Sequence, residues 1–63
     1  MGTTMLARII LVAENSAGNI TVRTRAYTPD GMHDIASAWE EFAERRWTCR
    51  VFISVDEMEA VGE

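Results

Sequence analysis

The first half of the chain contains two stretches whose patterns of hydrophobic and polar residues predict β-strands. Residues 4–13 are rich in β-branched and aliphatic side chains, and residues 20–27 alternate between hydrophobic and polar positions with a period of two. The residues between them, 14–19, are turn formers, and Gly18 or Asn19 can take a positive φ. We therefore expect two strands that form an antiparallel hairpin.

A helix is expected to follow, from about Pro29 to Arg46. Thr28 or Asp30 can cap its first turn, and Pro29 suits the same turn. At 100° per residue, the hydrophobic side chains form one continuous sector, and the opposite sector is polar and largely acidic. The hydrophobic sector contains Met32, Ile35, Ala36, Ala38, Trp39, Phe42 and Ala43. This pattern predicts an amphipathic helix with an acidic outer side.

A third alternating stretch covers residues 48–55 and predicts a third strand. The order β-β-α-β is most economically assembled as an α+β fold, in which a three-stranded antiparallel sheet has the first strand at its centre and the helix on one face. Parallel pairing of the second and third strands is the alternative. Residues 54–57 have the spacing of a capping box, so a short C-terminal helical turn through residues 58–61 is also expected.

Length and composition indicate a single small domain. The 63 residues are 48% hydrophobic and 25% charged, which argues against disorder, and residues 1–3 and 59–63 are expected to be loose tails. The net charge of −4 is unevenly distributed. Residues 1–29 hold three arginines and one acid, whereas residues 30–63 hold three arginines and nine acids. The two parts of the chain therefore carry opposite net charge.

Cysteine content and hydropathy favour a cytoplasmic protein. A single cysteine, Cys49, cannot form an internal disulfide. The apolar run at residues 9–13 is shorter than the core of a signal peptide, and no stretch approaches the roughly 20 apolar residues of a membrane span. We expect no membrane partner.

The candidate catalytic residues do not form a recognisable constellation. His33 is expected on the wet side of the helix and Cys49 in the core, so they cannot act together as base and nucleophile. Glu40 and Glu44 are one helical turn apart, but such a pair is usually a solvated surface rather than a metal site. A small metal-assisted enzyme is thus a third hypothesis only. We expect no enzymatic activity, no cofactor and no metal.

The face of the sheet away from the helix is expected to be an interaction surface. The side chains expected toward the helix are Ile9, Leu11, Val22, Val51 and Ile53. Those expected on the opposite face are Leu6, Arg8, Ile10, Val12, Arg23, Arg25, Tyr27, Arg50 and Phe52. Arginine and aromatic residues among aliphatic ones are typical of interface cores. This face is expected to bind a second copy, giving a homodimer, or another protein.

The leading functional hypothesis is a non-enzymatic protein-binding module. The acidic helix residues Asp34, Glu40, Glu41 and Glu44 would meet a larger protein with a basic nucleic-acid-binding surface. In size and charge the chain is similar to small phage-encoded inhibitors of bacterial defence proteins, including anti-CRISPR proteins. That likeness implies a small acidic inhibitor or regulator of a larger bacterial protein, in the cytoplasm of a bacterial cell or a phage-infected host.

Single-stranded nucleic-acid binding by the open sheet face is the alternative hypothesis. Four arginines would contact phosphates and two aromatic residues would stack on bases. These residues are Arg8, Arg23, Arg25, Arg50, Tyr27 and Phe52. The net charge of −4 argues against it, because domains of this kind are usually basic.

Overall fold

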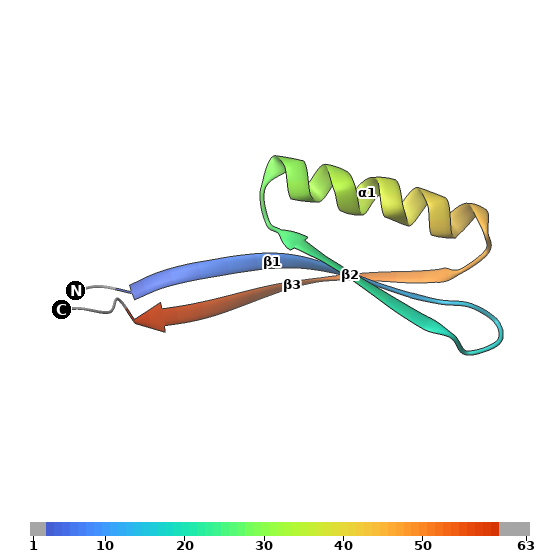
Figure 1. The fold of residues 1–63 in the computed structure, drawn as a ribbon, viewed down its shortest axis with the longest axis horizontal. Helices are drawn as coiled ribbons and strands as arrows, with labels where there is room; N and C mark the ends of the chain where they lie inside the picture. The colour runs from blue at the N-terminus through green and yellow to red at the C-terminus, as the bar shows by residue number, and fades with distance from the viewer. Residues whose placement is uncertain (1–2, 60–63) are drawn as a thin grey trace.

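The computed structural model describes the backbone of residues 3–59 and the side chains of residues 7–55, and in this part of the chain it has three strands and one helix (Figure 1). The elements are β1 (Thr3–Glu14), β2 (Ile20–Ala26), α1 (Pro29–Glu44) and β3 (Thr48–Glu59). The sheet order is β2-β1-β3, and β1 pairs antiparallel with both neighbours. The predicted α+β fold is confirmed, and the parallel alternative is wrong.

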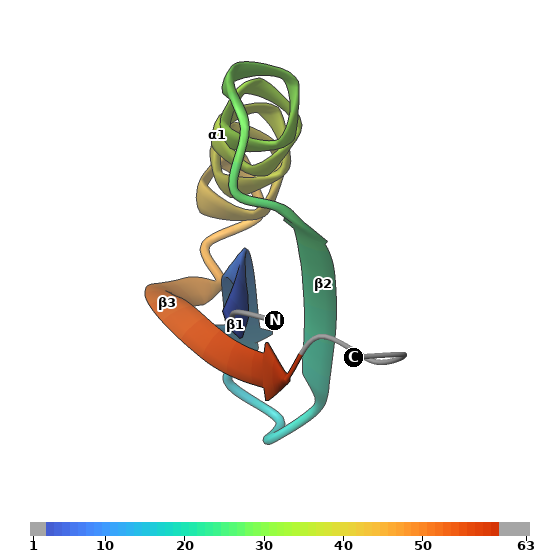
Figure 2. The ribbon, with the colours of Figure 1, turned by 90° about the vertical axis from the view of Figure 1, so that its left-hand side faces the viewer.

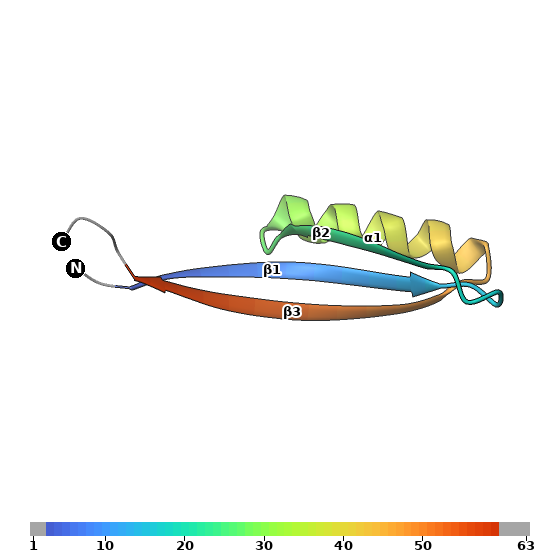
Figure 3. The ribbon, with the colours of Figure 1, turned by 60° about the horizontal axis from the view of Figure 1, so that its bottom comes forward.

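The three strands cover unequal lengths of the sheet. β2 pairs with β1 from Arg8 to Glu14, whereas β3 pairs with β1 along its whole length. Beyond β2, residues 3–7 and 55–59 continue as a two-stranded ribbon that projects past α1 (Figures 1 and 3). The helical turn expected at the C-terminal end does not form in residues 54–59, which belong to β3. Residues 1–2 and 60–63, parts of the expected tails, lie outside the described residues.

The hairpin loop is organised by one asparagine side chain. The Oδ1 atom of Asn15 accepts hydrogen bonds from the backbone N–H of Ala17 at 3.0 Å and of Asn19 at 2.9 Å. Gly18 has a φ of 90°, which an L side chain would strain, and its N–H donates to the Asn15 carbonyl at 3.0 Å. The predicted turn formers therefore make the turn, but over residues 15–19, because Glu14 belongs to β1.

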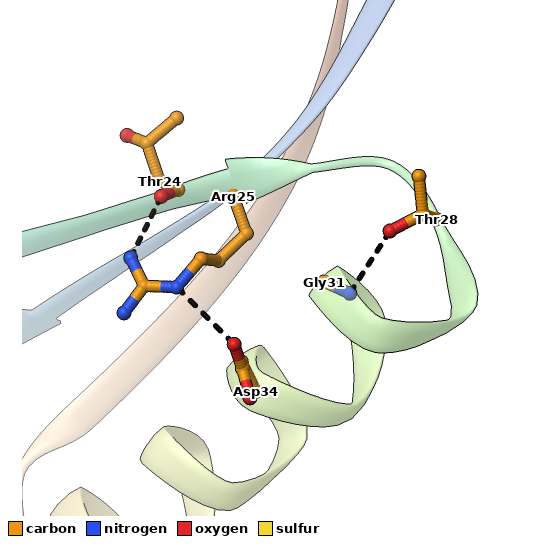
Figure 4. Close-up of polar contacts among 5 residues, drawn as sticks. All are labelled: Thr24, Arg25, Thr28, Gly31 and Asp34. Atoms are coloured by element: carbon orange, nitrogen blue, oxygen red, sulfur yellow. Dashed lines mark hydrogen bonds and ion pairs between the residues drawn. The ribbon is translucent and has the colours of Figure 1, made fainter.

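The first turn of α1 is capped by Thr28 and lies close to β2. The Oγ1 atom of Thr28 accepts a hydrogen bond from the backbone N–H of Gly31 at 3.1 Å (Figure 4). Gly31 is buried, and a Cβ at this position would lie 1.8 Å from the backbone oxygen of Ala26. Glycine thus allows the helix to approach the strand that precedes it.

The C-terminal end of α1 is a Schellman motif that contains an arginine where glycine is usual. The N–H groups of Arg46 and Trp47 donate to the carbonyls of Ala43 and Phe42, at 3.0 and 2.9 Å. Arg46 has a φ of 67°. The Trp47 and Phe42 rings, 5.1 Å apart between centroids, form the hydrophobic contact of this motif. The helix therefore ends at Glu44, two residues before the expected position.

Substituting Arg46 with glycine should stabilise the protein by about 1 kcal/mol, because glycine adopts a positive φ without steric cost. The free energy of unfolding, from urea denaturation followed by circular dichroism, measures this effect. The matched control is Arg45→Gly. Arg45 has a φ of −87°, so glycine there adds backbone freedom without relieving strain and should not stabilise. Equal effects at both positions would contradict this explanation.

The hydrophobic core lies between α1 and the central strand. The buried side chains of the described region are Ile9, Leu11, Ala13, Ile35, Ala38 and Phe42, with Trp47 and Cys49 packed against them. Figure 2, viewed along the sheet, shows α1 on one side of the strands. The core therefore consists of a single helix–sheet layer, and the opposite side of the sheet has no covering element among the described residues.

Candidate functional site

The arginines of β2 lie on the face of the sheet that α1 covers, which corrects their expected placement. Directly opposite residues of an antiparallel pair point to the same face. Arg23 is paired with the buried Leu11, and Arg25 with Ile9. The Arg23 guanidinium carbon lies 5.4 Å from the centroid of the Phe42 ring. Both arginines therefore belong to the packing around the helix and not to the open face.

Arg25 also forms an ion pair with the helix. Its Nε atom lies 3.4 Å from Oδ2 of Asp34, and its Nη1 atom donates to the carbonyl of Thr24 at 2.8 Å (Figure 4). Both charged side chains remain about half exposed, so the contact aligns the helix with β2 rather than adding much stability. Asp34, expected to be available to a partner, already has a basic neighbour.

A one-residue difference in the hairpin explains the wrong placement. With a turn over residues 14–19, Ala13 would face Ile20 and Leu11 would face Val22. In the structure β1 extends to Glu14, which pairs with Ile20, so that Leu11 faces Arg23. Since side chains alternate between faces, this shift moves every β2 side chain to the other side of the sheet. Val22, expected beneath the helix, lies on the open face.

Two further side chains also differ from expectation or fall outside what the structure describes. Tyr27 follows β2 in the connection to α1, where its N–H donates to the Ala7 carbonyl at 3.0 Å. Leu6 belongs to β1, but its side chain lies outside the described ones. The arginines of the described open face are therefore Arg8 and Arg50, and the set proposed to contact nucleic acid is divided between two faces.

We define the open face as the side of the sheet away from α1. Its described side chains are Arg8, Ile10, Val12 and Glu14 of β1, Ile20, Val22, Thr24 and Ala26 of β2, and Thr48, Arg50, Phe52 and Ser54 of β3. The large hydrophobic side chains of the two outer strands are exposed, with Ile20 at 61% and Phe52 at 51% of their full accessibility, whereas Ile10 and Val12 of the central strand are half-buried. Exposed hydrophobic side chains of this kind are typical of an interaction surface.

A second hydrophobic surface lies on the helix side of the sheet, between α1 and β3. A helix is about 10 Å wide and covers about two strands spaced 4.8 Å apart, which leaves part of the third strand uncovered. The resulting α1–β3 groove is lined by Ile9, Met32, Ile35, Ala36, Trp39, Glu40 and Val51. Trp39 remains 39% exposed, and Ile53 and Val55 extend the hydrophobic strip along β3. The sequence assigned Trp39 to the core, whereas the structure places it at the edge of this groove.

The acidic helix residues are divided between the two sides of α1. Glu40 lines the α1–β3 groove, whereas Asp34 faces β2 through its contact with Arg25. Glu41 is two helical turns after Asp34 and lies on the same side, and Glu44 is one turn after Glu40. All four are exposed. Among these four acidic residues, Glu40 is the one that lines the hydrophobic α1–β3 groove.

The residues weighed for catalysis or metal binding are not brought together. Cys49 is half-buried against the core, and its Sγ lies 3.9 Å from the Trp47 carbonyl oxygen. His33 is exposed on α1. Within the described part of the chain, no group of three or more His, Cys, Asp or Glu residues could hold a metal ion.

No significant match to this chain was found among protein-family models, curated proteins or solved structures. Over the described residues, no helix has the length and hydrophobicity needed to cross a membrane. What the fold and the site define is thus a small α+β protein with two exposed hydrophobic surfaces on opposite sides of its sheet.

Proposed function

We propose that the protein is a non-enzymatic protein-binding module, a small acidic inhibitor or regulator of a larger bacterial protein that handles nucleic acid. The observation that carries this proposal is the α1–β3 groove, which joins the exposed hydrophobic side chains Met32, Trp39 and Val51 to the carboxylate of Glu40. Exposed tryptophan in a depression is typical of the residues that dominate binding energy at protein interfaces.

The chemistry of the groove selects a partner with a basic surface. A complementary segment presents a hydrophobic side chain to the groove and an arginine or lysine to Glu40, with Glu44 one turn further along α1. Surfaces that bind nucleic acid are rich in such basic residues. Carboxylates that occupy these residues compete with phosphates, which is how a protein of this kind would inhibit its partner.

Two properties of the whole chain support the same proposal. The net charge of −4 accelerates the approach to a basic surface. The likeness in size and charge to phage-encoded anti-CRISPR proteins is consistent with an anti-defence role in the cytoplasm of an infected cell, where the unpaired Cys49 would stay reduced.

Reversing the charge of Glu40 should weaken partner binding by about tenfold or more, because a lysine there opposes the basic group of the partner. The measurement is affinity capture from a bacterial lysate, quantified by mass spectrometry, with wild type, Glu40→Lys and Glu41→Lys. A partner of the groove is retained by wild type and Glu41→Lys and is depleted with Glu40→Lys. Purified wild type should then displace an oligonucleotide from this partner in a mobility-shift assay.

Glu41→Lys is a matched control for charge and exposure. It changes the net charge by the same amount, is also exposed, and lies about 100° around α1 from Glu40, away from the groove. Equal losses of binding with both variants would show that the overall field, and not the groove, selects the partner. A captured partner that keeps its oligonucleotide in the presence of excess protein would contradict the inhibitory role.

A further inference from the structure

Along β1, the open face carries hydrophobic side chains at its centre and opposite charges at its two ends. In order along the face, the β1 side chains are Arg8, Ile10, Val12 and Glu14. Phe52 of β3 lies opposite Ile10, and Val22 of β2 lies opposite Val12, so the hydrophobic centre extends over all three strands. Neither Arg8 nor Glu14 has an ion pair or a side-chain hydrogen bond among the described side chains.

This order is complementary to itself when two open faces stack with their β1 strands antiparallel. Consider a two-fold axis in the plane of the interface that crosses β1 at right angles between Ile10 and Val12. The axis places Arg8 of each copy over Glu14 of the other, and Ile10 of each copy over Val12 of the other. Each dimer then contains two pairs between Arg8 of one copy and Glu14 of the other.

The neighbouring strand fits the same axis. Along β3 the open face presents Thr48, Arg50, Phe52 and Ser54, with Arg50 opposite Val12 and Phe52 opposite Ile10. The axis therefore places Arg50 of each copy over Phe52 of the other. A guanidinium over an aromatic ring is a favourable cation–π contact.

We propose that the protein forms a homodimer in which two open faces stack antiparallel about this axis. Packed sheets lie about 10 Å apart, a distance that an arginine and a glutamate side chain can bridge together, and their strands cross at about 30°. The α1 helices lie on the two outer sides of this dimer, so the α1–β3 grooves and the acidic helix residues stay accessible. The proposal does not depend on the function assigned to the groove.

The parallel arrangement is disfavoured by the same charges. A two-fold axis along β1 would place Arg8 over Arg8 and Glu14 over Glu14, with like charges facing each other at both ends. The antiparallel footprint, three strands wide and seven residues long, is roughly 14 by 23 Å. That is about 320 Å² on each copy, well below the roughly 800 Å² per partner of a standard specific interface, so the dimer should be weak and should dissociate on dilution.

Charge exchange across the open face tests the arrangement. Sedimentation equilibrium over a concentration series should give wild type a mass approaching twice 7.1 kDa at the highest concentrations. Arg8→Glu and Glu14→Arg should each weaken the dimer by about tenfold or more, since each places like charges opposite each other at both pairs. An equimolar mixture of the two single variants should form a heterodimer, because every charge then meets its opposite. The double variant Arg8→Glu/Glu14→Arg should dimerise like wild type.

Circular dichroism of each variant at low concentration establishes that the monomers are folded, which the exposure of both residues favours. A wild-type protein that stays a monomer throughout the series would overturn the proposal. So would single variants that dimerise as strongly as wild type. If the single variants lose the dimer and neither the mixture nor the double variant regains it, the antiparallel arrangement is wrong.

Discussion

Replacing Gly31 with alanine should destabilise the protein by about 3 kcal/mol or more, because the new methyl group cannot be accommodated where α1 meets β2. The added Cβ would lie 1.8 Å from the backbone oxygen of Ala26 and 3.2 Å from the Cβ of Arg25. The nearest atom is backbone, so the first turn of the helix must move away from the strand. Total stability at this length is about 3–9 kcal/mol, so the variant should lose a third or more of it.

The sign of this effect separates steric conflict from helix propensity. In an unhindered helix, alanine is more stable than glycine by about 1 kcal/mol, so propensity alone predicts stabilisation. Gly18→Ala is a useful control, because Gly18 has open space around it and a φ of 90°. That variant should lose about 1 kcal/mol through backbone strain. Urea denaturation that shows Gly31→Ala to be as stable as wild type would rule out the close approach of helix and strand.

Replacing Phe42 with alanine should cost about 3–5 kcal/mol, the usual range for a buried aromatic side chain. Phe42 is 5% exposed and lies where three elements meet. It contacts Trp47 after the helix and lies beneath Arg23 of β2. Its removal leaves a cavity in the core, and the Schellman motif and the arginine of β2 lose their hydrophobic partner. Thermal unfolding followed by tryptophan fluorescence and circular dichroism measures the loss.

Phe52→Ala is the matched control for this substitution. Phe52 lies on the open face and is half exposed, so its truncation should cost less than about 1 kcal/mol when the protein is dilute enough to be monomeric. Similar losses for Phe42 and Phe52 would mean that the open face is part of the core of the monomer. That outcome would also contradict the division of the molecule into one packed layer and one exposed face.

The element order, the central position of β1 and the sides of β1 and β3 that face the helix could be predicted from the sequence. In β1, Ile9 and Leu11 are flanked by arginine and glutamate, and the helix has one hydrophobic sector, so few arrangements bury both. The same reasoning placed Cys49 next to the core, where the structure has it half-buried. These elements are specified by strong, local periodicity.

The face of β2 could not be predicted, because alternation yields two sets of side chains without saying which is inside. Hydrophobicity alone predicts that Val22 faces the helix, but the register decides the face, and the register depends on whether Glu14 belongs to the turn or to the strand. The long stem of Arg23 can cover the flank of a helix as an aliphatic residue would. Arg25, which pairs with Asp34, and Arg23, which lies over Phe42, therefore do not form the free basic surface that alternation predicts.

The two-stranded ribbon of β1 and β3 can open separately from the core, so the molecule does not unfold as one cooperative unit. Residues 3–7 pair with residues 55–59 and with no third strand, and none of the described buried core side chains belongs to this segment. The ribbon can therefore open from its free end without exposing Leu11 or Phe42 to water. Amide protons in the ribbon and in the core accordingly report two different free energies of opening, and the second is the stability of the fold.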